Sequence, residues 1–118
     1  MAATDVTEET HRSVKKITWT WTSDASGDYS QQTAGSYSGE VLMLITNPDG
    51  TAAPADDYDV VINDEDGYDI LVGQGVDRDT ADTEYVIASM GAVANDKLTL
   101  VVDNAGNTKK GVVVLLLR

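Results

Sequence analysis

The end of the chain carries two apolar runs separated by residues that favour a turn. Leu98–Val102 is the first run, and Val112–Leu117 is the second, an unbroken run of six apolar side chains. The residues Asp103–Asn107 between them tolerate the positive φ angles of a tight turn, which predicts a hairpin. Because the terminal run offers nothing to water on either face, we expect both faces to be covered. The core would cover one face, and a loop, the N-terminal segment or another subunit would cover the other.

The clearest alternation of apolar and polar positions lies in Val14–Thr22. Ile17, Trp19 and Trp21 fall on one face of an extended chain, and threonines fall on the other, which predicts a strand. Two tryptophans on one face of a strand favour a place in the core. The competing interpretation is an exposed aromatic platform that binds carbohydrate.

Further short apolar stretches are separated by turn signals, and no segment has the period of an amphipathic helix. Two of them, on either side of Asp64–Gly67, predict a second hairpin. The predicted strands of this group are Tyr29–Thr33, Glu40–Thr46, Asp57–Asn63, Tyr68–Val72 and Glu84–Ser89. The sequence therefore predicts an all-β fold, an antiparallel β-sandwich or jelly-roll-like domain of seven or eight short strands.

The first residues differ from the rest of the chain. Met1–Ser13 holds many threonines and glutamates and has Val6 as its one larger aliphatic side chain beyond the initial methionine. This composition predicts a flexible N-terminal arm over residues 1–13 and a sandwich domain over residues 14–118. The arm either stays disordered or becomes ordered on a partner.

The charge of the chain is strongly acidic and unevenly distributed. The formal net charge is −12 at pH 7, and residues 17–96 hold 16 acidic residues against one basic residue, Arg78. Such a field repels phosphate groups, so we expect no nucleic acid and no anionic membrane as a partner. Arg12, Lys15 and Lys16 precede this acidic region and are candidate anchors, either to the acidic body of this protein itself or to an acidic partner surface.

The residues that carry chemistry do not form a recognisable active site. There is no cysteine, and His11, the one histidine, lies in the predicted arm, so the sequence predicts no enzyme and no cofactor. The acid-rich segment 56–69 does not fit an EF-hand, because Ile62 and Gly73 then fall on ligand positions 1 and 12. Whether it binds Ca²⁺ in another geometry is left open.

Five segments of the chain carry a resemblance to known proteins: Lys16–Asp28, Tyr37–Gly39, Tyr58–Asp69, Gln74–Thr80 and Asn104–Asn107. In these segments the chain resembles small virion structural proteins of tailed bacteriophages, in particular capsid cement (decoration) proteins. The resemblance implies a non-enzymatic protein, made in the host cytoplasm, that oligomerises on the capsid exterior of the virion and clamps neighbouring major capsid subunits. A head–tail connector or tail component is the first alternative, and a carbohydrate-binding β-sandwich is the second.

The interface expected from these interpretations combines charge and apolar surface. On the apolar side it takes one face of the terminal run, Val113, Leu115 and Leu117. On the charged side it takes the basic residues that follow the arm, Arg12, Lys15 and Lys16.

Overall fold

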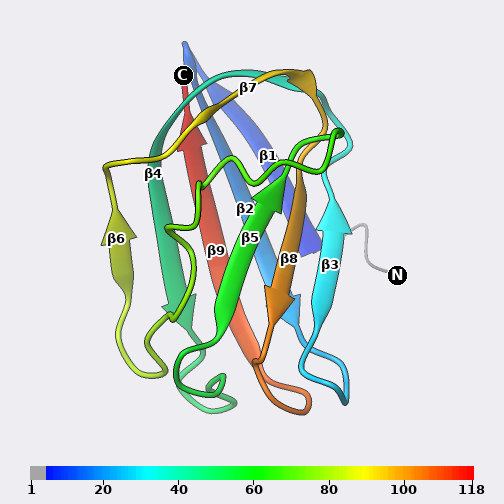
Figure 1. The fold of residues 1–118 in the computed structure, drawn as a ribbon, viewed down its shortest axis with the longest axis vertical. Coiled ribbons are helices and arrows are strands. Elements are labelled where there is room, and N and C mark those ends of the chain that lie inside the picture. Colours follow the sequence, from blue (N-terminus) through cyan, green and yellow to red (C-terminus); the bar gives the residue numbers. More distant parts are fainter. Residues whose placement is uncertain (1–4) are drawn as a thin grey trace.

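The computed structural model describes residues 5–118, which form a two-layered β-sandwich (Figure 1). Its strands are β1 (Val6–His11), β2 (Val14–Thr22), β3 (Tyr29–Gln32), β4 (Tyr37–Pro48), β5 (Asp59–Asn63), β6 (Glu84–Val86), β7 (Ala92–Asp96), β8 (Thr99–Asp103) and β9 (Lys110–Leu117). The larger sheet has six strands, in the order β1-β2-β9-β4-β6, with β7 also paired to β4, and the smaller sheet has the order β3-β8-β5. The predicted all-β sandwich is confirmed, with nine strands among the described residues.

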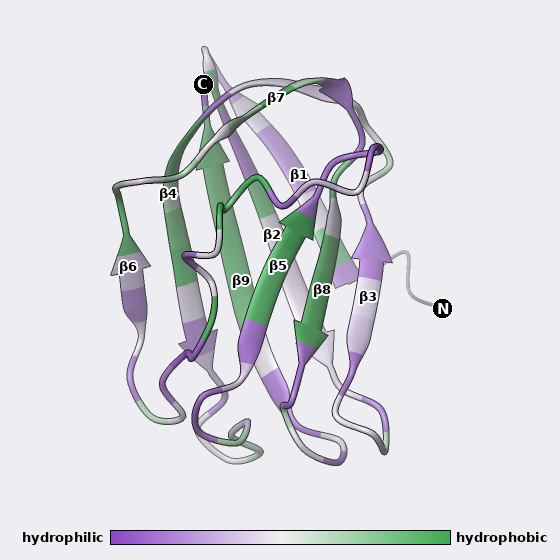
Figure 2. Ribbon diagram, in the orientation of Figure 1, coloured by the Kyte–Doolittle hydropathy of each residue, from purple (hydrophilic) through white to green (hydrophobic). Residues whose placement is uncertain are grey.

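The core lies between the two sheets and is built by alternation. Figure 2 shows the apolar residues concentrated on β4, β9, β5 and β8, while the loops that join the strands are mostly polar. The predicted strand Val14–Thr22 is confirmed as β2, and Ile17, Trp19 and Trp21 are fully buried. Trp21 packs against Tyr58, with ring centroids 5.7 Å apart. Burial of this aromatic pair is one of the larger apolar contributions to the core.

The two apolar runs at the end of the chain do form strands, but they do not pair with each other. β8 pairs with β3 and β5 in the small sheet, whereas β9 pairs with β2 and β4 in the large sheet. The predicted hairpin is therefore wrong. The turn that follows β8 carries the chain from one layer of the sandwich to the other, and each apolar strand occupies the centre of its own sheet (Figure 1).

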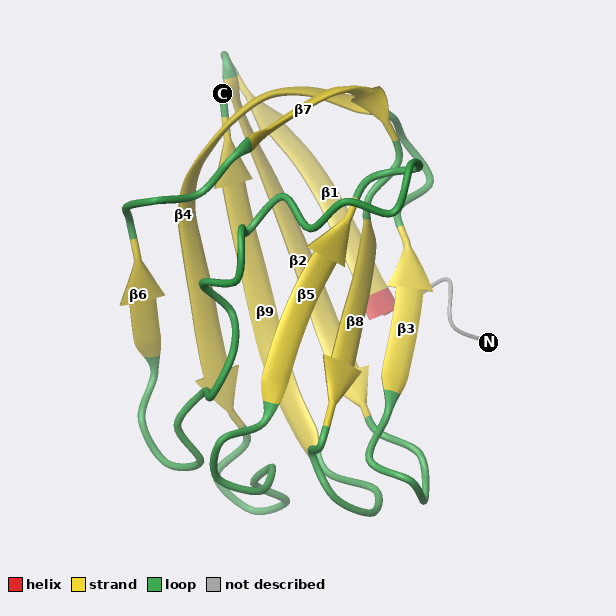
Figure 3. Ribbon diagram, viewed as in Figure 1, coloured by secondary structure: helices red, strands yellow, loops and turns green. Residues whose placement is uncertain are grey.

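The second predicted hairpin forms in part. The turn closes, because the Asp64 N–H donates to the Tyr68 carbonyl and the Ile70 N–H donates to the Ile62 carbonyl. Beyond a single bridge between Asn63 and Asp69, the chain leaves the sheet and continues as turns, as the loop following β5 in Figure 3 shows. Ile70 still reaches the core, where it is 3% exposed.

The N-terminal segment is more ordered than its composition suggested. The predicted flexible arm over residues 1–13 is corrected for residues 6–11, which form β1 and pair antiparallel with β2; residues 1–4 lie outside the described range. Glu8 fastens this strand to the loop before β4. Its carboxylate accepts hydrogen bonds from the Tyr37 hydroxyl at 2.6 Å and from the N–H groups of Ala34 and Gly35.

The strand β9 is central in its sheet but covered on one face only. Val113, Leu115 and Leu117 face the small sheet and are fully buried. The opposite face of β9 has no second layer, and its side chains stay half-buried among their own neighbours. The expectation that both faces of the terminal run are covered therefore fails within the single chain. Within residues 5–118, there is no helix with the length and apolarity to span a membrane.

Candidate functional site

The outer face of the large sheet carries apolar side chains that no second layer covers. Strict alternation along β9 turns Val112, Val114 and Leu116 outwards. In the cross-strand register Val114 lies opposite Ile45 of β4, and Ile45 lies opposite Tyr85 of β6. Directly opposed residues share a face, so these side chains form one continuous apolar band.

The band is widened and bordered by neighbouring side chains. A β-bulge between Val41 and Met43 shifts β4 by one residue, so that Met43 lies opposite Leu116. We call the six outward apolar side chains from β4, β6 and β9, together with the threonines beside them, the outer face; its members are Met43, Ile45, Tyr85, Val112, Val114, Leu116, Thr18 and Thr20. Tyr85 is the most exposed of the apolar members, at 65%.

One end of the outer face is hollowed. A depression of about 420 Å³ lies between β2, β4 and β9, and its lining includes Thr20, Asn47, Lys110 and Val112. The Asn47 side-chain carbonyl also accepts a hydrogen bond from the Thr83 hydroxyl. Polar side chains therefore line part of this depression, which lies beside the apolar band.

The basic residues predicted as anchors are brought to one end of the large sheet. Arg12 occupies the exposed turn between β1 and β2, with φ of 60°, next to the end of β9 (Figure 1). Lys15 donates from its ammonium group to the Ser38 carbonyl at 3.2 Å, and Lys16 points outwards opposite Glu9 and Leu116. Lys16 thus borders the outer face, whereas Lys15 is engaged within the chain.

The apolar half of the predicted interface is on the wrong face of its strand. Val113, Leu115 and Leu117 are fully buried between the sheets, so they present no surface to a partner. Their neighbours in sequence, Val112, Val114 and Leu116, take the outward positions. An unbroken apolar run holds no alternation, so its sequence could not indicate which set faces the core.

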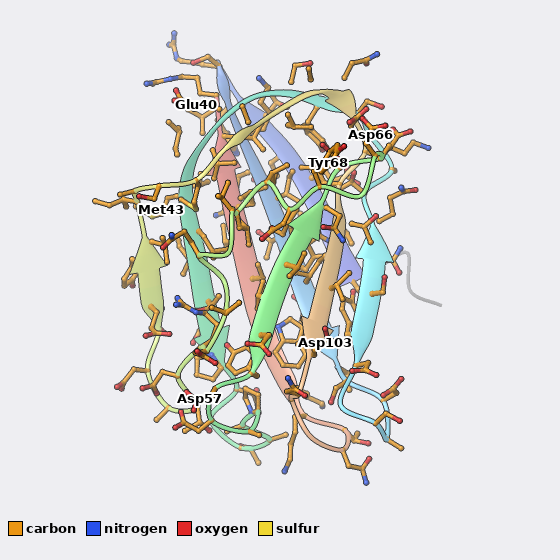
Figure 4. The ribbon with its side chains drawn as sticks, in the orientation of Figure 1. Glu40, Met43, Asp57, Asp66, Tyr68 and Asp103 are labelled. Carbon is orange, nitrogen blue, oxygen red and sulfur yellow. The ribbon has the colours of Figure 1, made fainter. Side chains whose placement is uncertain are left out.

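Acidic side chains lie at both ends of the sandwich, with Asp66 near the end that holds the C-terminus and Asp57 and Asp103 towards the opposite end (Figure 4). At the end near the C-terminus, carboxylate oxygens of Asp64, Asp66 and Asp96 lie within 4.8 Å of one another. Partial burial, followed by the charges of Asp66, Glu65 and Asp64, raises the pKa of Asp96. The sequence singled out the first two of these acids but missed Asp96, which β7 brings in from 30 positions further along the chain.

A second carboxylate group crosses one end of the small sheet. Asp59 of β5 lies opposite Asp103 of β8, and Asp28 directly precedes β3, on the other side of β8. Burial, a hydrogen bond with Asp28 and the charges of Asp28 and Asp59 raise the pKa of Asp103. The small sheet therefore carries a concentrated negative field that the outer face of the large sheet lacks.

The residues considered for catalysis and carbohydrate binding are placed apart. His11 is exposed at the end of β1, where its ring nitrogen lies 2.8 Å from the Glu9 carboxylate, two residues away in the same strand. Trp19 and Trp21 are fully buried, and the Trp19 indole N–H donates to the Gln31 carbonyl. The prediction that both tryptophans belong to the core is confirmed.

Comparison with known proteins gives no relative from which a role could be transferred: no protein-family model matches the chain, and no curated protein is similar to it. The arrangement itself is suited to contact between macromolecules. It presents an apolar band with a lightly charged border on one side, and dense carboxylate groups elsewhere.

Proposed function

We propose that this chain is a non-enzymatic virion structural protein, a capsid cement (decoration) protein that oligomerises and clamps neighbouring major capsid subunits. The observation that carries the proposal is the outer face, an apolar sheet surface left open on a strongly acidic chain. Contiguous exposed apolar patches of about a few hundred Å² or more mark interaction sites in soluble proteins. The resemblance of its loops and turns to small phage virion proteins supplies the kind of partner.

The geometry favours this function over a carbohydrate-binding module. Such a module would stack sugars on exposed aromatic rings, and the two tryptophans of β2 have no exposed area. The remaining exposed tyrosines, Tyr68 and Tyr85, lie on different parts of the molecule and do not form a platform with them.

The basic turn at Arg12 is the proposed contact with the acidic surface of the capsid. It lies in the exposed turn between β1 and β2, at one end of the large sheet. Charge complementarity at a rim chiefly raises the association rate and its dependence on salt.

The test is copy number together with occupancy. Quantitative mass spectrometry of purified particles should find this chain in amounts comparable to the major capsid protein. A ring-sized stoichiometry of about six or twelve copies would instead identify a connector or tail component. Particles stripped of the chain should rebind the wild type, and Arg12→Ala should rebind more slowly at low salt. Asn107→Ala, which changes an exposed turn residue at the opposite end, is the matched control.

A further inference from the structure

We propose that the outer face of the large sheet binds the outer face of a second copy of this chain, so that two sandwiches pack back to back through their large sheets. The inference rests on the part of the proposed function in which the chain oligomerises, and it does not depend on a capsid. Three properties of the face lead to a second copy as its occupant: its apolar content, its charge and its size.

The apolar side chains of the outer face are arranged as in a sheet whose face packs against a second sheet. Val112, Val114 and Leu116 alternate with fully buried core residues along β9, and Ile45 and Met43 continue the band on β4. The side chains are branched or small towards β2, where Thr18 and Thr20 adjoin the band. Such a surface is smooth enough to pack face to face with another sheet at a spacing of about 10 Å.

The charge of the face distinguishes it from the rest of the molecule. The outward positions of β1, β2, β4, β6 and β9 carry two carboxylates, Glu9 and Glu40, and two ammonium groups, Lys16 and Lys110. These charges cancel, whereas the whole chain has a formal net charge of −12. Two copies that approach through any carboxylate-rich end repel each other, but two copies that approach through the outer faces do not.

The size of the face is sufficient for a specific pair. Five adjacent strands of about eight residues span roughly 24 by 26 Å at ordinary strand spacings, or about 600 Å² per copy. Two copies would then bury about 1,200 Å², the lower end of the range for stable interfaces. A two-fold axis through the band makes the contact self-complementary and closed, so the expected product is a dimer and not a filament.

The self-association of the purified chain tests this inference without any particle. Sedimentation equilibrium between about 1 and 500 μM should give a molar mass that rises from 12.6 kDa to twice that value. Val114→Lys should weaken the dimer by about 100-fold or more, because the pair would bury two unpaired ammonium groups. Tyr68→Lys makes the same change of charge at a side chain that is 72% exposed, away from the outer face (Figure 4), and should leave the dimer intact.

A cross-link gives a second measurement that does not depend on Val114→Lys folding correctly. The chain has no cysteine, so Val114→Cys introduces a single thiol at the centre of the band, where the proposed two-fold axis brings the two copies of this side chain together. Oxidation should yield a disulfide-linked dimer, and Asn107→Cys should not. A wild type that is monomeric up to 500 μM, or a dimer that survives Val114→Lys unchanged, overturns the inference. Either result leaves the copy number in particles, and with it the capsid role, to be judged separately.

Discussion

Glu8 is the side chain that holds the first strand against the rest of the sandwich. Partial burial raises its pKa, but hydrogen bonds from Tyr37, Ala34 and Gly35 outweigh burial, so the net pKa lies below the ordinary value of 4.5. A carboxyl group whose pKa is lowered by folding stabilises the fold above its unfolded pKa. This contribution is lost as the pH falls through the lower, folded pKa.

We therefore expect Glu8→Gln to lower the free energy of unfolding at pH 7 by about 1 kcal/mol, the usual net value of a lost hydrogen-bond set of this kind. The difference from wild type should persist down to about pH 5 and shrink below pH 4.5. Urea denaturation at pH 7 and pH 3 measures both. Glu9→Gln, on the exposed side of the same strand, is the control, and an equal loss in the two variants would contradict the assignment.

The Trp21 ring packs against position 111 so closely that only a glycine fits there without strain. A Cβ atom at this position would lie 2.6 Å from Cζ2 of Trp21, a ring that is fully buried and cannot withdraw. Gly111→Ala should therefore cost about 1–3 kcal/mol through overpacking. Gly50→Ala is a matched control, because a Cβ there would meet no atom within 4 Å. Thermal denaturation compares them, and melting temperatures that agree within error would show that the core yields at this point.

At the scale of elements, β1 is a structural strand and not a detachable arm. Removing residues 1–11 would take away the ladder to β2 and the Glu8 hydrogen bonds, and would leave β2 as an unpaired edge. We expect a loss of about 2 kcal/mol or more and a greater tendency to aggregate. Calorimetry and light scattering measure the two effects. Thr7→Ala, which changes one outward side chain of β1, should have little effect.

The strands show which parts of the fold could be predicted from the sequence. The alternation in Val14–Thr22 identified β2 and its buried face, and the apolar runs at the end of the chain correctly predicted β8 and β9. The pairing of those two strands could not be predicted, since a turn composition indicates that the chain reverses but not whether it stays in one sheet. β1 was missed because its ordering depends on Glu8 and on the edge of β2, which are tertiary contacts.

The candidate site was predicted less well than the fold. The choice of Arg12, Lys15 and Lys16 as anchors stays a prediction; Arg12 lies in the exposed β1–β2 turn, whereas Lys15 and Lys16 belong to β2. To predict the apolar half of the interface, one must know which alternate residues of β9 face the core, and an unbroken apolar run does not show this. Asp96 lies close to Asp64 and Asp66 only because β7 pairs with β4, a long-range contact that no local sequence pattern indicates.

At the scale of the whole molecule, unbalanced negative charge opposes folding. Carboxylates crowd at one end of the small sheet and at the turn after β5, with few basic side chains nearby. Salt screens such repulsion, so the melting temperature should rise between 10 mM and 0.5 M sodium chloride. A melting temperature that does not change would show that the carboxylates are already compensated.

The crowded carboxylates give the stability of the fold a pH dependence opposite to that given by Glu8. Folding raises the pKa values of Asp103, Asp96 and Asp57 above the ordinary 3.8, so their ionised forms destabilise the fold. Protonation relieves this, and stability should therefore increase as the pH falls from 7 towards these raised pKa values. Asp103→Asn should be more stable than wild type at pH 7 and should gain less on acidification. Asp82→Asn, in an exposed loop, is the control, and equal behaviour of the two variants would contradict the cause proposed.

The placement of β8 and β9 also determines when the sandwich can begin to exist during synthesis. Each is the middle strand of its sheet, and both come from the last twenty or so residues of the sequence described here. Until they leave the ribosome, β3 and β5 have no partner between them, and β2 and β4 are likewise separated by an empty position. A nascent chain that ends before residue 99 should therefore gain no protease resistance from either sheet. Insertion of one β-arch, residues 99–117, would complete both layers in a single cooperative step.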